Sequence, residues 1–298
     1  MKKTGSVINN NATTKEKEYK KYINFGKLHL KESTFISNED TFIDEMKKNF
    51  ESKFAHNNEF VLDKKFDIKT ESLVDREEKL SFKKITSSND HFFGTFSRFS
   101  TNKDVLTDIV DNKSNEKIDP DTIYFEHNTL FYIDYGSKSI SFIKTEHIKN
   151  VYPFLEAFIN NNNILNISII PLVKDDKEIV DSIITELEIS FASVDITADQ
   201  PFVGLNNLEK MGCTVKNYKL NVTLDKVNSS FSSKLLHFRS KNRENIKKMS
   251  ISTFDEDIDL LTNRFTKSVP IKLSNNYEKD FTIIESTLKS ELLKAIQW

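Results

Sequence analysis

The chain is poor in glycine and cysteine. It has six glycines in 298 residues, and the two closest, Gly204 and Gly212, are eight positions apart. The glycine-rich loops that hold nucleotide phosphates therefore cannot be written on this sequence. The single cysteine, Cys213, excludes an intrachain disulfide, a four-cysteine zinc site and an iron–sulfur cluster. Without a disulfide framework, we expect a reducing, cytoplasmic environment.

The chain also lacks a large net charge and a long apolar run. Forty-three Lys and Arg oppose 45 Asp and Glu, so any basic surface must be local. The longest apolar run, residues 164–173, contains two polar residues and a proline, and is far short of the ~20 residues of a membrane helix. Residues 1–21 have no apolar segment and predict a polar tail rather than a signal peptide. We expect a soluble protein whose 24 phenylalanines supply the core.

Hydrophobic periodicity predicts an α+β fold with largely antiparallel sheet and flanking amphipathic helices. Residues 42–54 and 281–296 carry apolar side chains at helical spacing, whereas the charged stretch 174–181 is expected to be a connector. Three strands are expected in a meander over 122–126, 129–134 and 139–144, the first pair joined by a turn at His127 and Asn128. The polar stretch 103–120 divides an N-terminal part, 22–118, from a C-terminal part, 119–298, unless the two form one domain.

No pattern in the chain predicts a catalytic residue, a metal site or a cofactor. The six histidines are dispersed, and neither H-E-x-x-H nor G-x-S-x-G occurs. Asp63 and Asp67 with Lys69 resemble the minimal element of a magnesium-dependent nuclease. In a chain so rich in acids and lysines, a solvated strand face explains these three residues more simply, and we expect no enzyme.

The strongest local excess of charge lies in residues 233–249. This basic segment has a net charge of +5, because one acid, Glu244, opposes six cations: Lys234, Arg239, Lys241, Arg243, Lys247 and Lys248. If the segment from about Asn242 onward is helical, Arg243 and Lys247 lie on adjacent rows of that helix. Such a patch on a neutral protein can bind nucleic-acid phosphates by releasing counterions, with little sequence preference. A solvated surface is the competing interpretation of the same charges.

The order of elements resembles the RexA exclusion proteins of temperate phages, over approximately residues 22–297. The resemblance rests on a succession of segments: IDPDTIYFEHNTLFYI (118–133), HIKNVYPFLEAF (147–158), NILNISIIPL (163–172), KDDKEIV (174–180), NNLEKMG (206–212), YKLNVTL (218–224) and SISTFDEDIDL (250–260). It is a likeness of pattern, not of a diagnostic motif. A Ser-Asn insert at 228–233, the N-terminal tail and the long 103–120 connector depart from it.

The resemblance implies a function in anti-phage defence. RexA-type proteins are prophage-encoded, homodimeric, α+β proteins that bind DNA without strong sequence preference and act in phage exclusion, an abortive infection, with a small membrane protein. The six cations of the basic segment would then be the DNA-binding residues of a non-enzymatic protein. A defence subunit of the KwaB kind, the magnesium-dependent nuclease and a purely protein-binding module are the alternatives.

Overall fold

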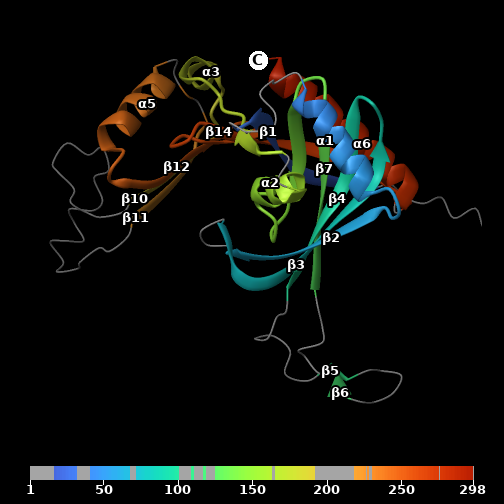
Figure 1. The fold of residues 1–298 in the computed structure, drawn as a ribbon. Coiled ribbons are helices and arrows are strands. Elements are labelled where there is room, and N and C mark those ends of the chain that lie inside the picture. The colour runs from blue at the N-terminus through green and yellow to red at the C-terminus, as the bar shows by residue number, and fades with distance from the viewer. Residues whose placement is uncertain are drawn as a thin grey trace, which may run out of the picture.

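The structure, a computed structural model, describes residues 17–31, 41–67, 72–100, 109–110, 117–118, 125–162, 165–191, 218–225, 227, 230–274 and 276–297. Its helices are α1 (Phe42–Lys53), α2 (Tyr152–Ile159), α3 (Asp176–Asp181), α5 (Phe231–Asn242) and α6 (Tyr277–Ile296), with a 3₁₀ turn at Asn160–Asn162 (Figure 1). None of these described helices has both the length and the apolar composition needed to cross a membrane.

Most described strands form one antiparallel sheet, which confirms the predicted fold class. The order across the sheet is β11-β10-β12-β13-β14-β1-β8-β7-β4-β3-β2, and β9 also pairs with β1. The bounds of these strands are β1 (Lys17–Leu30), β2 (Glu59–Asp67), β3 (Ser72–Ser87), β4 (His91–Ser100), β7 (Phe125–Asp134), β8 (Ser139–Lys144), β9 (Ile167–Pro171), β10 (Glu186–Phe191), β11 (Tyr218–Thr223), β12 (Ile246–Ser252), β13 (Glu256–Asp259) and β14 (Arg264–Leu273). A separate two-stranded pair consists of β5 (Ile109–Val110) and β6 (Lys117–Ile118).

Strand β1 lies in the middle of the sheet and joins its two halves. It pairs with β14 and, further along, with β9 on one edge, and with β8 on the other. Strands from both expected parts of the chain, 22–118 and 119–298, therefore belong to one sheet. The strand begins at Lys17, so the last residues of the expected 1–21 tail are extended and hydrogen-bonded.

An aromatic core fills the space between α1, α2 and one face of the sheet. Phe158 of α2 is fully buried and stacks on Phe82 of β3, with ring centroids 4.3 Å apart. Phe50 of α1 packs against both Phe158 and Phe92 of β4. Burial of such large rings is the dominant favourable contribution to folding on this side.

A second, mainly aliphatic core lies on the opposite face of the sheet. Ile284, Leu288 and Leu292 of α6 are buried there, as the helical spacing of the C-terminal segment predicts. Leu235 of α5 and Ile179 of α3 belong to the same cluster. Helices α3, α5 and α6 thus lie on one face, and Figure 1 shows no described helix on the other face of β10 and β12.

Two predictions about local structure are wrong. Residues 125–134 form one strand, β7, without a turn at His127 and Asn128, because all ten residues pair with β4. The predicted hairpin between β7 and β8 is confirmed. The expected connector 174–181 contains helix α3, which begins at a capping box: Asp175 accepts from the Glu178 backbone and Glu178 accepts from the Asp175 backbone.

Candidate nucleic-acid interface

The basic segment forms helix α5, a short turn and the start of strand β12. Leu235 is buried, and Leu236 and Phe238 are partly buried against the aliphatic core. These residues hold α5 on the sheet and leave its polar side in solvent. The helix ends at Asn242, and the residues after it form a turn and strand β12 rather than the helix that the sequence analysis considered there.

The side chain of Arg239 is hydrogen-bonded within the protein. Its guanidinium donates to the Leu260 carbonyl at 3.0 Å, to Asn263 Oδ1 at 2.8 Å and to the Asp176 carboxylate at 3.0 and 3.2 Å. The side chain is only 15% exposed. Hydrogen bonds from Asn263 and Arg239 hold the pKa of Asp176 below its usual value. Arg239 thus joins α5 to α3, and we remove it from the expected set of phosphate contacts.

Lys234 and Lys241 form an exposed row on α5. They are seven residues apart, which is two helical turns and roughly 10 Å along the same side of the helix. Neither ammonium group has a hydrogen bond or ion pair with another described residue. Both are therefore free to meet an external anion.

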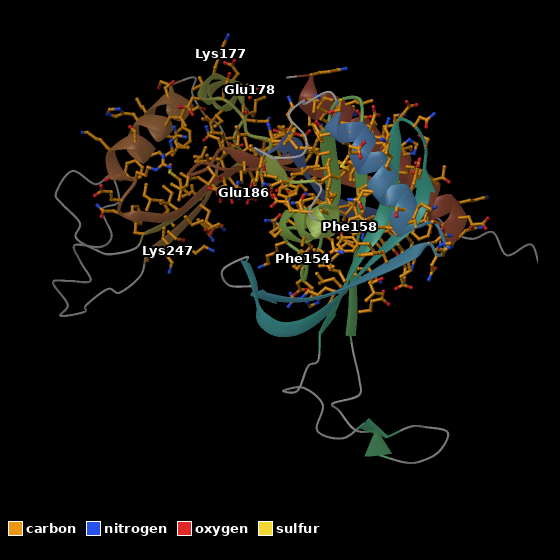
Figure 2. All side chains as sticks on the ribbon, in the orientation of Figure 1. Phe154, Phe158, Lys177, Glu178, Glu186 and Lys247 are labelled. Atoms are coloured by element: carbon orange, nitrogen blue, oxygen red, sulfur yellow. The ribbon has the colours of Figure 1, made fainter. Side chains whose placement is uncertain are left out.

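Arg243 and Lys247 continue the positive charge beyond the end of α5. Arg243 is exposed, and its one side-chain hydrogen bond to a described residue is a long 3.4 Å contact to the Leu261 carbonyl. Lys247 is exposed at the irregular start of β12, where the register with β10 shifts. Figure 2 shows Lys247 projecting from the side of the strands opposite α5. The predicted cations therefore flank the α5–β12 turn on two sides rather than forming one flat patch.

Lys248 belongs to a three-residue charge cluster on the same strands. Glu188 of β10 lies between Lys248 of β12, at 2.9 Å, and Lys219 of β11, at 3.0 Å. The hydrogen bond from Lys248 is the largest cause that holds the pKa of Glu188 below its usual value. Both lysines remain more than half exposed, and together with Glu188 they carry a net charge of +1.

Sequence patterns did not identify Lys219 as part of the basic surface, nor Asp176 and Glu188 as the partners of its cations. Lys219 lies outside the basic segment and joins Lys248 only through strand pairing with β10. Asp176 is 63 residues from Arg239. The capping-box spacing of Asp175 and Glu178 could have indicated α3, but no local signal indicates its contact with α5.

The alternative sites lie largely beyond the described side chains. Asp63 and Asp67 are on strand β2, but their side chains are outside the described set, and Lys69 and Cys213 are outside the described residues altogether. Among the residues that the structure does describe, no group of three or more His, Cys, Asp or Glu could hold a metal ion.

Comparisons with known proteins add no relative. The chain matches no model of a known protein family, and no curated protein is significantly similar to it in sequence. The likeness to RexA proteins therefore rests on the order of elements in the sequence alone.

Proposed function

We propose that the chain is a non-enzymatic protein that binds DNA without sequence preference, in a prophage-encoded phage-exclusion system. The observation that carries the DNA-binding proposal is the exposure of Lys234, Lys241, Arg243 and Lys247, none of which is paired with a described carboxylate. Cations left free in this way replace counterions on a phosphate backbone, and binding driven by counterion release is insensitive to sequence.

The assignment to phage exclusion, a homodimer and a small membrane-protein partner are parts of the same proposal. They come from the resemblance of the element order to RexA proteins, which act in that setting. The DNA-binding surface can be tested without them, because phosphate contact depends only on the cations of one subunit.

A triple variant tests this surface directly. Lys234→Ala, Lys241→Ala and Lys247→Ala together remove three positive charges and no buried side chain. Fluorescence anisotropy with a labelled random-sequence duplex should show affinity reduced at least about tenfold at low salt. The matched control changes three exposed lysines elsewhere: Lys272, Lys279 and Lys289.

The control variant loses the same net charge, and it should retain most of the affinity. An equal loss of DNA affinity in the two triple variants would show that overall charge, and not the cations around the α5–β12 turn, determines binding. Unchanged affinity in the first triple variant would contradict the proposed surface. Reproducible cleavage of the duplex with Mg²⁺, abolished by Asp67→Ala, would replace the binding proposal with the nuclease.

A further inference from the structure

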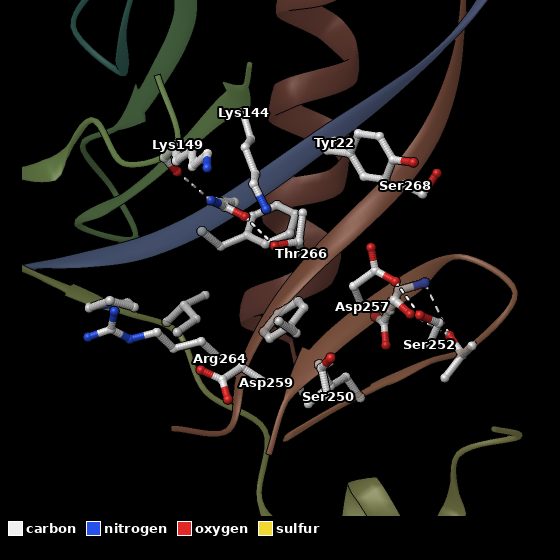
Figure 3. Close-up of a pocket in the computed structure, with 18 of the residues that line it drawn as sticks. Tyr22, Lys144, Lys149, Ser250, Ser252, Asp257, Asp259, Arg264, Thr266 and Ser268 are labelled. Atoms are coloured by element: carbon white, nitrogen blue, oxygen red, sulfur yellow. Dashed lines mark hydrogen bonds between the residues drawn. The ribbon is translucent and has the colours of Figure 1, made fainter. Parts of the chain in front are cut away.

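A polar pocket lies on the open face of the sheet, away from α5 and α6. It has a volume of about 680 Å³ and is lined by strands β1, β10, β12, β13 and β14 and by the segment before α2. Figure 3 shows it in close-up. Its size is within the ~300–1,000 Å³ range of small-molecule sites. We call it the open-face pocket.

One row of polar side chains crosses the floor of the open-face pocket. Strand register places Ser252, Asp257, Thr266 and Asn24 side by side on β12, β13, β14 and β1. Ser252 Oγ donates to Asp257 Oδ1 at 2.6 Å, and Thr266 Oγ1 donates to Asn24 Oδ1 at 2.6 Å. Asp257 is exposed and retains acceptor capacity toward a ligand.

Three cations of the pocket come from other parts of its wall. Lys144 is the last residue of β8, Lys149 precedes α2, and Arg264 begins β14. All three are exposed, and none of their side-chain nitrogen atoms has a hydrogen bond or ion pair with a described residue. Figure 3 shows Lys144 and Lys149 together on one side, Asp257 with Ser252 on another, and Arg264 beside Asp259. The pocket thus has two lysines at one end and the Asp257 carboxylate at the other, and further side chains of both signs, Lys248 and Glu188 among them, also line it.

Two buried hydroxyl groups in the pocket have no hydrogen-bond partner among the described residues. Tyr152 is 6% exposed, and its hydroxyl makes no hydrogen bond within that part of the chain. Its ring is fixed against Gly26, where an added Cβ would lie 3.0 Å from Tyr152 Cζ. Ser268 Oγ is also buried without a hydrogen bond. Buried hydroxyls are normally paired, so an unpaired one at a pocket wall indicates a missing ligand or water.

Burial raises the pKa of Tyr152, which keeps its hydroxyl neutral and available as a donor. A neutral donor in a pocket that also holds these three cations suits an anion whose oxygen atoms accept several hydrogen bonds, and phosphate is such a group. Carboxylates at the other end accept hydrogen bonds from hydroxyl groups. Tyr22, which lines the same pocket and is 37% exposed, offers a ring face for stacking.

We propose that the open-face pocket binds a small phosphorylated sugar, free or as a nucleotide, with its phosphate toward Lys144 and Tyr152 and its hydroxyl groups toward Asp257. This site goes beyond the proposed DNA contact and uses none of the four free cations of that contact; Lys248, which is paired with Glu188, lines the pocket. A sugar phosphate can contact both ends of the pocket, because its phosphate suits the lysines and its hydroxyl groups suit the carboxylate. Inorganic phosphate would use the cationic end alone.

Isothermal titration of the full chain with four probes tests the ligand class. The probes are adenosine monophosphate, ribose 5-phosphate, adenosine and inorganic phosphate. The two phosphorylated sugars should bind, and adenosine and inorganic phosphate should bind at least about tenfold more weakly, because each lacks one half of the contacts. Tighter binding of the nucleotide than of ribose 5-phosphate indicates base stacking, and equal binding indicates a sugar-phosphate site.

Two variants test the residues. Lys144→Met removes an exposed charge, and Tyr152→Phe removes only the unpaired hydroxyl, so both should fold with unchanged or higher melting temperature. Each should weaken ribose 5-phosphate binding about tenfold, the usual loss for one charge-assisted hydrogen bond. Lys289→Met on α6, a matched loss of one exposed lysine, should bind as the unaltered chain does.

Three results would overturn the proposal: no binding of either phosphorylated sugar at millimolar concentration, inorganic phosphate binding as tightly as ribose 5-phosphate, or affinity unchanged in both pocket variants. Duplex DNA affinity, measured on the same variants, separates the two sites. It should be unchanged by Tyr152→Phe, while the Lys234, Lys241 and Lys247 triple variant should bind ribose 5-phosphate normally.

Discussion

Arg239 of α5 and Asp176 of α3 form an ion pair whose nitrogen and oxygen atoms are 3.0 Å apart. The two helices lie side by side above the aliphatic core, and the same guanidinium also donates to the Leu260 carbonyl. A cation that the sequence assigns to DNA is thus a link between three elements. Within the basic segment, Arg239 therefore has a structural role, whereas Lys234, Lys241, Arg243 and Lys247 have no carboxylate partner among the described residues.

We predict that Arg239→Ala destabilises the chain without removing DNA binding. The substitution leaves the Leu260 carbonyl and Asn263 without their donor, and hydrogen bonds from a charged group contribute about 1.5–3 kcal/mol. The free energy of unfolding, measured by urea denaturation, should fall by about 2 kcal/mol. Duplex affinity of the folded protein should change less than threefold.

Lys241→Ala, two residues further along α5, is the matched control. It removes one exposed cation with no partner among the described residues, so we expect a change in unfolding free energy of about 0.5 kcal/mol or less. A larger loss of DNA affinity in Arg239→Ala than in Lys241→Ala would mean that our division of the cations is wrong.

A second prediction concerns the close approach of strands β3 and β4. A Cβ added to Gly94 would lie 2.5 Å from the backbone carbonyl oxygen of Lys83, which belongs to the paired strand and cannot move aside. Gly94→Ala should therefore lower the free energy of unfolding by about 1–3 kcal/mol, as overpacking does. Thermal and urea unfolding both measure this loss.

Gly136→Ala provides the control for Gly94→Ala. The added Cβ would meet only Asp134 Oδ2 at 3.6 Å, an ordinary contact in the turn between β7 and β8. We expect this variant to unfold close to the unaltered chain. Equal destabilisation by both substitutions would point to a general effect of replacing glycine and would contradict the steric account.

The third prediction is a pH dependence that arises at His127. Burial is the main cause that lowers the pKa of His127, and His147 and Arg98 lower it further; the His127 and His147 rings stack 3.9 Å apart. As the pH falls below about 6.5, the unfolded chain takes up this proton before the folded chain does. Stability should therefore decrease from about pH 7.5 to about pH 5.5.

His127→Gln removes this proton uptake and should make the unfolding free energy fall less over the same pH interval. His56→Gln is the control, because His56 lies exposed after α1 and is solvated in both states. Urea denaturation at each pH gives the values. An identical pH dependence in the unaltered chain and in His127→Gln would show that other groups cause it.

Local sequence patterns predicted those elements whose apolar residues recur at the spacing of a helix or of a strand. In α6, Ile284, Leu288 and Leu292 recur four residues apart and all three are buried. The β7–β8 hairpin was found because its turn residues stand between two runs of strand formers. Helical spacing and turn residues depend only on neighbours in sequence, so they can be recognised without knowledge of the fold.

Features that depend on distant partners could not be predicted. His127 and Asn128 have the composition of a turn, yet Asn128 pairs with Ser97 of β4, and pairing along the whole strand keeps β7 extended. The role of Arg239 depends on Asp176, which is 63 positions away. The open-face pocket likewise assembles polar residues from strands between 24 and 268, each of which alone is an ordinary solvated strand position.

The salt dependence of duplex binding tests the central claim most directly. The slope of log Kd against log salt concentration counts the phosphate charges that the protein neutralises, about 0.9 for each contact on duplex DNA. If Lys234, Lys241 and Lys247 make such contacts, the triple alanine variant should have a slope smaller by about 2 to 3 than that of the unaltered chain, with the same ranking of DNA sequences. An identical slope in the two proteins, or loss of binding to one sequence only, would contradict the account.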